Sequence, residues 1–339
     1  MSSCAQTMIK KRKGRSSGSF MKEKKAKEKK AKEKKLKKSK VKETKPVTVQ
    51  DPNRGSVEND VFIPKIKFIY PEETDEQLIK VEKKRKVKLD VKYYNRLTNV
   101  IFKIGQFFFK IIFVLIAHPL VRIRYHLKVE GREHLKAHKK RLKKEGFLTV
   151  SNHVFLWDYV ALCASMRMGL PNVPAWGKII YSRFGGWFSL AGVVPIPEDK
   201  SVFRKFYQFV GDIFKQNKWV HIYPETGLWY YYVPIRPFKR GAAVFAYQYN
   251  KPIIPVGYSF RERTGISRWF NKKDPYVTVH ICPPVWPDRS KDKPTAVEEM
   301  NERIRTSIMH AVGIENEEEN KKIMEQYYQY EKGHFYTKL

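Results

Sequence analysis

The longest apolar stretch of the chain, Ile104–Val121, limits most strongly how this sequence can fold. As an α-helix its 18 residues would measure about 27 Å, close to the thickness of a membrane's hydrocarbon core. A wide apolar face beside a narrow cationic stripe is typical of a helix that lies in the plane of a membrane interface. The stripe consists of polar and cationic residues that recur every three or four positions: Lys92, Arg96, Asn99, Lys103, Gln106 and Lys110.

The residues around this stretch favour an in-plane or re-entrant segment over a simple span. We expect the helix, within residues 91–121, to end at His118-Pro119, since proline cannot continue a helix without losing a hydrogen bond. Arg122 and Arg124 follow, so basic residues flank both sides and the positive-inside rule gives no orientation. The alternative is a core helix packed inside the domain.

The 3 cysteines show no CxxC spacing, which favours a reducing compartment. Together with the in-plane helix, this predicts a protein at the cytoplasmic face of a membrane, with peripheral or monotopic attachment.

The charge of the chain predicts an anionic partner. Lys and Arg number 68 against 34 Asp and Glu, a formal net charge of +34. Residues 1–45 repeat Lys-rich pentads with almost no apolar side chains, so we expect a disordered basic tail attracted to anionic membrane lipid. Residues 46–90, interrupted by prolines, are expected to be a linker with a short strand at Val61–Tyr70, and residues 313–339 a C-terminal tail.

A histidine and an aspartate stand at a predicted strand-to-helix corner. Gly146–Ser151 is expected to form a short apolar strand, and Trp157–Met168 a helix packed on a sheet. His153 lies in the turn between them and Asp158 in the first helical turn, where a carboxylate can accept the Nδ1–H of the imidazole. The other ring nitrogen is then held outward as a base. A lone histidine beside a strand is more often structural.

Further blocks follow this corner in a fixed order. After Asn152–Asp158 (NHVFLWD), the chain continues with Gly192–Ile196, then a strand that ends in Tyr223–Gly227 (YPETG), Phe238–Ala242 (FKRGA) and the Pro-rich strand Pro252–Tyr258. In this order the blocks resemble those of the glycerolipid acyltransferase family, the lysophosphatidic acid acyltransferase-like proteins. The similarity covers roughly residues 100–312.

The resemblance implies a fold and a reaction. It implies an α/β acyltransferase domain over residues 122–312, with a mostly parallel central sheet flanked by helices, preceded by the N-terminal membrane-interface helix. The implied reaction in phospholipid biosynthesis moves a fatty acyl group from a thioester to a glycerol hydroxyl of a lysophospholipid, with His153 as base and Asp158 as its orienting partner. Acyl-CoA or acyl-carrier protein would be the co-substrate. No metal or other cofactor is implied, and no His, Cys or carboxylate cluster has ligand spacing.

The expected substrate-binding residues depart in part from the family pattern. The family's arginine after the second-block glycine is replaced by a run containing Glu198, and Leu228-Trp229 follow the third block where an arginine usually stands. Glu225 resembles the family's acceptor-binding carboxylate. Cations elsewhere are candidates for holding a phosphate, each with an ordinary surface role as the alternative: Lys178, Arg183, Arg236, Lys239 and Arg240.

Two other functions compete with an acyltransferase. The charge of +34 also suits a nucleic-acid-binding protein, although no RRM, KH, zinc-finger or helix-turn-helix signature accompanies it. The displaced arginines also suit a non-catalytic membrane adaptor on the same fold. The aromatic residues of the central region, such as Trp187 and Trp229, have three alternatives: an acyl groove, the lipid interface or the core.

Overall fold

The structure is a computed structural model that describes most of the chain after residue 85. It covers residues 56–58, 61–64, 68, 70–71, 73–74, 76–80, 84, 86–265, 274–328 and 337–338. The predicted basic tail, residues 1–45, lies outside the described residues.

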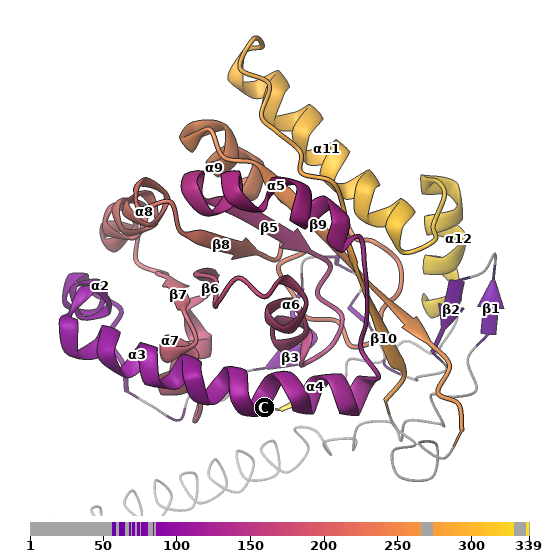
Figure 1. Ribbon diagram of the computed structural model, residues 1–339, viewed down its shortest axis with the longest axis horizontal. Coiled ribbons are helices and arrows are strands. Elements are labelled where there is room, and N and C mark those ends of the chain that lie inside the picture. Colours follow the sequence, from indigo (N-terminus) through magenta and orange to yellow (C-terminus); the bar gives the residue numbers. More distant parts are fainter. Residues whose placement is uncertain are drawn as a thin grey trace, which may run out of the picture. The chain divides into compact units, whose positions relative to one another are not determined.

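A five-stranded sheet forms the centre of the domain (Figure 1). Its strands run in the order β4-β10-β9-β5-β8, and every neighbouring pair is parallel except β9 and β10. The bounds are β4 Lys128–Glu130, β5 Phe147–Ser151, β8 Trp219–Ile222, β9 Ile253–Arg261 and β10 Tyr276–Ile281. A parallel pair, β6 (Val173–Trp176) and β7 (Val193–Ile196), adjoins β8 through a bridge between Asn172 and Val220. This arrangement confirms the predicted α/β class with a mostly parallel sheet.

The central position of β5 follows from its sequence. All five residues of Phe147–Ser151 are buried, as expected for a strand that has neighbours on both sides. Its parallel partners are β8 on one side and β9 on the other. Because parallel strands end at the same edge of a sheet, the residues that follow β5 and β8 meet there, and the predicted site residues lie in these two connections.

Helices pack around the sheet, and several begin with a capping side chain. Asp199, for example, accepts a hydrogen bond from the Ser201 amide at the start of α8, and the buried face of that helix includes Phe206, Val210 and Phe214. Helices α9 and α11 lie together beside β9 (Figure 1). The bounds are α5 Arg132–Glu145, α6 Asp158–Met166, α7 Gly185–Leu190, α8 Lys200–Lys215, α9 Gly241–Tyr249, α11 Lys293–Ala311 and α12 Glu317–Tyr328, with a 3₁₀ helix at Gly177–Tyr181.

The predicted interfacial helix is two helices, and it does not end where expected. Helix α2 (Val91–Thr98) stops at Asn99, whose side chain accepts from the Ile101 amide and caps α3 (Val100–Ile112). The second helix then runs through a π-helical turn, Phe113–Ala117, into α4 (His118–Tyr125). The expectation of an end at His118-Pro119 is wrong. The wide turn lies just before the proline, at the point where an ordinary α-turn would lose a hydrogen bond.

The long helix turns its polar side chains inward and its apolar side chains outward. Gln106 donates to the Ser189 carbonyl, and Gly105 lies against Leu190. By length and composition alone, Val100–Tyr125 is able to cross a membrane, and 6% of its most apolar window is buried. The exposed apolar residues are Val100, Ile101, Ile104, Phe107, Phe108, Ile111, Ile112, Leu115, Ile116, Leu120 and Ile123.

Parts of the predicted linker and C-terminal tail belong to the folded domain. In the linker region, β1 (Ser56–Glu58) pairs with β2 (Val61–Ile63), and Tyr70 and Leu78 are buried. At the other end, the Asn320 side chain of α12 exchanges two hydrogen bonds of 2.9 Å with the backbone of Ile235. The short strands β3 (Ile79–Lys80) and β11 (Thr337–Lys338) pair with each other in parallel. Both segments therefore support the loops that follow β8.

Candidate active site

His153 and Asp158 meet at the corner between β5 and α6. The Nδ1 atom of His153 lies 2.6 Å from Oδ2 of Asp158. The histidine side chain is 20% exposed, whereas the carboxylate is 2% exposed. Since Nδ1 is occupied by the carboxylate, Nε2 is the ring atom that can accept a proton from a bound substrate.

Tyr223, which follows β8, contacts both members of this pair. Its hydroxyl donates to Oδ1 of Asp158 at 2.9 Å, and its ring stacks on the imidazole with centroids 3.8 Å apart. Burial, and then the charge of Asp158, raise the pKa of Tyr223 well above its ordinary value, so the phenol stays protonated and remains a donor. Both oxygens of the buried carboxylate are thus hydrogen-bonded, which fixes its orientation toward His153.

The turn that carries His153 is fastened to β9. The side chain of Asn152 donates to the Tyr258 carbonyl at 3.0 Å and accepts from the Tyr258 amide at 2.8 Å. The Tyr258 hydroxyl donates to the backbone carbonyl of Asp158. These bonds set the backbone on both sides of the histidine, so its side chain is placed by the fold rather than by a flexible loop.

A buried ion pair holds the backbone of His153 from the other side. Oε2 of Glu225 accepts from the His153 amide at 2.9 Å and from Arg236 Nη2 at 3.0 Å, while Oε1 accepts from the Arg236 amide. The guanidinium also donates to the carbonyls of Gly227 and Thr74 and lies over the Trp229 ring at 4.3 Å. Buried charges are stable only when they are paired and hydrogen-bonded in this way.

These contacts correct the roles expected for Glu225 and Arg236. Their side chains are 1% and 0% exposed, so neither reaches a substrate in this arrangement. Arg236 therefore does not replace a missing phosphate-binding arginine. The pair instead ties the loop after β8 to the turn after β5, and so positions His153.

The other four predicted cations lie on the surface. Lys178 is 3.7 Å from Glu198 and lies over the Trp176 ring, and Arg240 is 3.2 Å from Glu298. Arg183 is exposed after the 3₁₀ helix. The side chain of Lys239 is exposed, while its amide donates to the Pro224 carbonyl, next to Glu225. Lys239 is thus the surface cation whose backbone lies nearest the Glu225 loop, and its phosphate-binding role stays a prediction.

Two further titratable groups behind the site are inactive in the folded protein. Burial, with a smaller contribution from His153, lowers the pKa of His221 to about 3, so this imidazole is neutral near pH 7. Its Nδ1 lies 2.8 Å from the Thr149 hydroxyl. Cys163 is fully buried, and burial raises the pKa of its thiol, so it does not supply a thiolate nucleophile.

Sequence reasoning missed Tyr223 and the contribution of residues 68–78. The Tyr70 hydroxyl donates to the Tyr230 carbonyl, and Trp229 Nε1 donates to the Glu76 carbonyl. A Cβ on Gly227 would lie 2.8 Å from that same carbonyl, so only glycine fits. The aromatic run after the third block is therefore core, buried against a segment whose prolines suggested a linker. Trp187, by contrast, is exposed beside Phe109 of α3.

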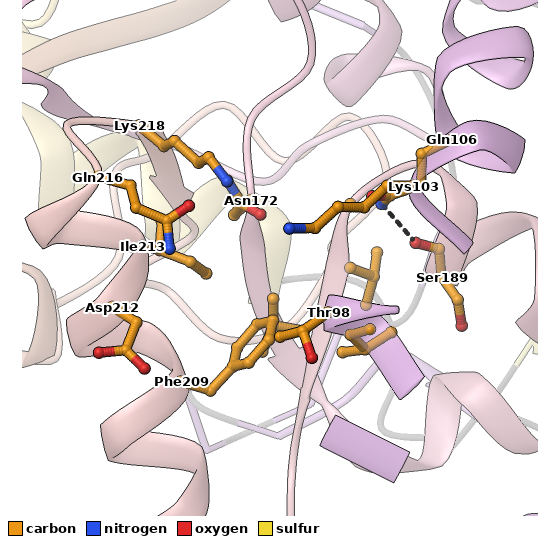
Figure 2. Close-up of a pocket in the computed structure, with 14 residues that line it drawn as sticks. Thr98, Lys103, Gln106, Asn172, Ser189, Phe209, Asp212, Ile213, Gln216 and Lys218 are labelled. Carbon is orange, nitrogen blue, oxygen red and sulfur yellow. Dashed lines mark hydrogen bonds between the residues drawn. The ribbon is translucent and has the colours of Figure 1, made fainter. Parts of the chain in front are cut away.

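The cavity in Figure 2 is lined by residues that precede strands, whereas His153 follows β5. Asn172, Gly192 and Lys218 precede β6, β7 and β8, and each of the three lines this cavity of about 110 Å³. Lys103 of α3 and Lys218 extend into it from two sides (Figure 2). Burial, and then the charge of Lys103, lower the pKa of Lys218. Among the described residues, no group of three or more His, Cys, Asp or Glu is placed to hold a metal ion.

Comparisons with known proteins bear on this site directly. Residues 126–259 match the family model described as Acyltransferase. These residues form an acyltransferase domain. The matched span includes His153, Asp158, Tyr223, Glu225 and Arg236, so the whole hydrogen-bonded site lies inside the domain. The resemblance predicted from the ordered blocks is confirmed.

Among solved structures, the chain is similar to the 1-acyl-sn-glycerophosphate (LPA) acyltransferase PlsC from Thermotoga maritima. The identity is 18%, the match covers 62% of this chain and 79% of that one, and the TM-score is 0.39. No curated protein matches the chain.

Proposed function

We propose that this acyltransferase moves a fatty acyl group from a thioester to a hydroxyl of a lysophospholipid at a membrane surface. The observation that carries the proposal is the 2.6 Å contact between His153 Nδ1 and the buried Asp158 carboxylate, with the imidazole partly open to solvent. A thioester is already activated, so a base that deprotonates an attacking hydroxyl is the main chemical requirement. The acyltransferase domain supplies such a base at the end of β5.

In the proposed reaction, His153 Nε2 takes the proton of the acceptor hydroxyl as its oxygen attacks the thioester carbonyl carbon. The carbon–oxygen bond forms, the carbon–sulfur bond breaks, and the leaving thiolate takes the proton from the imidazolium. Asp158 holds the tautomer and stabilises the transient positive charge. Tyr223 keeps the carboxylate in register.

Membrane association is the second part of the proposal. The outward apolar face of α3 and α4 supports it, because exposed side chains such as Phe107, Phe108 and Ile116 are costly in water unless an apolar phase covers them. A lipid acceptor would then be met in the membrane in which it resides. The proposed donors are acyl-CoA or acyl-carrier protein, and the proposed site of action is a cytoplasmic membrane face.

The test is an acyl-transfer assay of the purified full-length protein. Acyl-CoA and acyl-carrier protein are compared as donors, and lysophospholipids with and without a terminal phosphate as acceptors, with mass spectrometry of the product. We expect transfer by the wild type, loss in His153→Ala and retention in His310→Ala, an exposed histidine on α11. Wild-type and His153→Ala proteins that are equally inert over the whole panel would contradict the proposal and favour a non-catalytic adaptor.

A further inference from the structure

A cluster of cations lies beside the exposed helix, near the contact between α4 and α6. Arg122 Nη2 donates to the Ala164 carbonyl near the end of α6 at 2.7 Å, and Arg167 is the residue that ends that helix. Lys110 Nζ lies 3.1 Å from the position that a Cβ on Gly169 would take. We name as the arginine cluster the residues Lys110, His118, Arg122, Arg132 and Arg167.

The π-helical turn brings the helical members of the cluster into line. In a regular α-helix, Lys110 and His118 would point about 80° apart, since eight residues exceed two turns. The turn Phe113–Ala117 contains more residues per turn and so reduces this offset. His118 and Arg122 are four residues apart and share one face. Lys110 and Arg122 then both reach the C-terminal end of α6.

The cluster has little compensating negative charge. Within the described ranges, no ion pair links His118, Arg122, Arg132 or Arg167 to a carboxylate, and His118 Nε2 and Arg132 Nε are buried without a hydrogen-bond partner. Burial, then Arg167 and then Arg122, lower the pKa of Arg132. His118, Arg122 and Arg132 are partly buried, whereas Lys110 and Arg167 are exposed. Partly buried cations without a counter-charge are unfavourable, so the arrangement is suited to an anion.

The C-terminal dipole of α6 explains only part of the cluster. A helix C-terminus attracts one cation in its last turn, and Arg122 already occupies that place through the Ala164 carbonyl. The dipole does not explain why Arg132, from the first turn of α5, lies within electrostatic reach of two further guanidiniums. Arg122, Arg132 and Arg167 thus come from three different helices, and planar guanidinium groups are well suited to binding a phosphate.

We propose that the arginine cluster binds the phosphate of an anionic phospholipid headgroup at the membrane surface. Leu120 and Ile123, on the same helix as Arg122, are exposed and lie where acyl chains would follow. The phosphate of a reacting lysophospholipid acceptor is a less suitable occupant. Helix α6 separates Arg167 from Asp158 by nine residues, about 13 Å, whereas a reacting glycerol hydroxyl lies only a few bonds from its phosphate. The proposal rests on the membrane association proposed above and not on acyl transfer.

The experiment measures partition of the full-length protein onto vesicles by sedimentation. Vesicles of phosphatidylcholine alone are compared with vesicles that also contain phosphatidic acid. The variant R132Q/R167Q leaves Arg122 and its helix cap in place, and K103Q/K218Q removes the same charge from the cavity of Figure 2. We expect R132Q/R167Q to lose about thirtyfold in partition onto the acidic vesicles, and K103Q/K218Q less than about threefold. Binding to phosphatidylcholine alone should be unchanged in both.

Several outcomes would overturn the proposal. Equal losses in the two variants would mean that net charge alone matters, and a loss confined to K103Q/K218Q would move the phosphate site to the cavity. If added coenzyme A abolishes the difference between wild type and R132Q/R167Q, the cluster binds the phosphates of the thioester donor instead. R132K/R167K keeps the charge but not the planar fork, so we expect it to bind acidic vesicles less tightly than the wild type. If R132Q/R167Q does not fold, R132K/R167K is used in its place. Binding of R132K/R167K to acidic vesicles as tight as that of the wild type would contradict the proposal. Partition needs no turnover, so an inactive wild type leaves this result unaffected.

Discussion

The His153 site and the α3–α4 helix depart from the usual distribution of polar and apolar residues in opposite ways. At the site, the charges of Asp158, Glu225 and Arg236 are buried, and each finds its hydrogen-bond partners within the chain. Along the helix, side chains such as Phe107 and Ile116 are exposed, and no described residue covers them. The buried charges of the site are therefore paired with one another inside the domain, whereas the apolar face requires a partner from outside.

The buried ion pair gives the largest expected change in stability. Glu225→Gln leaves the Arg236 charge buried without its counter-charge, so we expect the free energy of unfolding to fall by about 3–5 kcal/mol. Glu298→Gln removes one partner of the pair with Arg240, in which both side chains are 64% exposed, and should cost less than about 1 kcal/mol. Denaturant unfolding measures both. Equal losses would show that the buried pair does not hold the site together.

The exposed helix face is tested by removing one of its rings. The Phe107 side chain is 60% exposed, and Phe107→Ser removes the ring that would contact lipid. We expect partition onto neutral phosphatidylcholine vesicles to fall roughly tenfold to a hundredfold, the usual value of burying one such side chain. Tyr207→Ser removes a ring that is 46% exposed on α8 and is the matched control. A similar loss in both variants would mean that the α3–α4 face is not the membrane contact.

Tyr223 tests whether the buried carboxylate is tuned by its second hydrogen bond. Tyr223→Phe keeps the ring over His153 and removes the hydroxyl that donates to Asp158. We expect kcat/KM to fall about tenfold. The acid limb of the pH–rate profile should move to higher pH, because the freed carboxylate stabilises the imidazolium more strongly. Tyr258→Phe, which loses a bond to the backbone carbonyl of Asp158, should leave the profile in place. If the pH–rate profile moves in neither variant, the Tyr223 hydroxyl does not influence the His153–Asp158 pair, and Tyr223 contributes only packing.

His221 gives a pH dependence of stability. Its pKa falls to about 3 in the folded protein from an ordinary 6.5, so below pH 6.5 the unfolded chain binds a proton that the folded chain does not. Stability should therefore fall with decreasing pH between 6.5 and 3, by up to about 1.4 kcal/mol per pH unit. The free energy of unfolding should differ less between pH 7 and pH 5 in His221→Gln than in the wild type or in His310→Gln. An unchanged difference would contradict the neutral, buried state of His221.

Much of the fold was predictable because its elements carry local signals. The apolar strand at Gly146–Ser151 and the buried strand at Pro252–Tyr258 appear as β5 and β9. The break at Asn99 was missed because periodicity alone does not distinguish a cap from one more stripe residue. Pro119 was taken as an end because a π-turn that accommodates it leaves no local signature.

The site was predictable where its residues are close in sequence and not where they are distant. The spacing of His153 and Asp158 indicated their contact before the structure placed them at 2.6 Å. Tyr223 and Arg236 act through contacts made 65 and 11 residues away, and only the parallel pairing of β5 and β8 brings Tyr223 to the pair. Charge type alone suggested that Arg236 binds phosphate, whereas burial gives it Glu225 as its partner.

The most direct test of the central claim, that Asp158 acts through His153, is a double-mutant cycle of acyl-transfer rates. The proteins are the wild type, His153→Ala, Asp158→Asn and the double variant, each verified as folded by circular dichroism. We predict that each single substitution lowers kcat by about a thousandfold or more and that the double variant is no slower than His153→Ala. A folded His153→Ala protein at the wild-type rate, or losses that multiply independently in the double variant, would contradict the account.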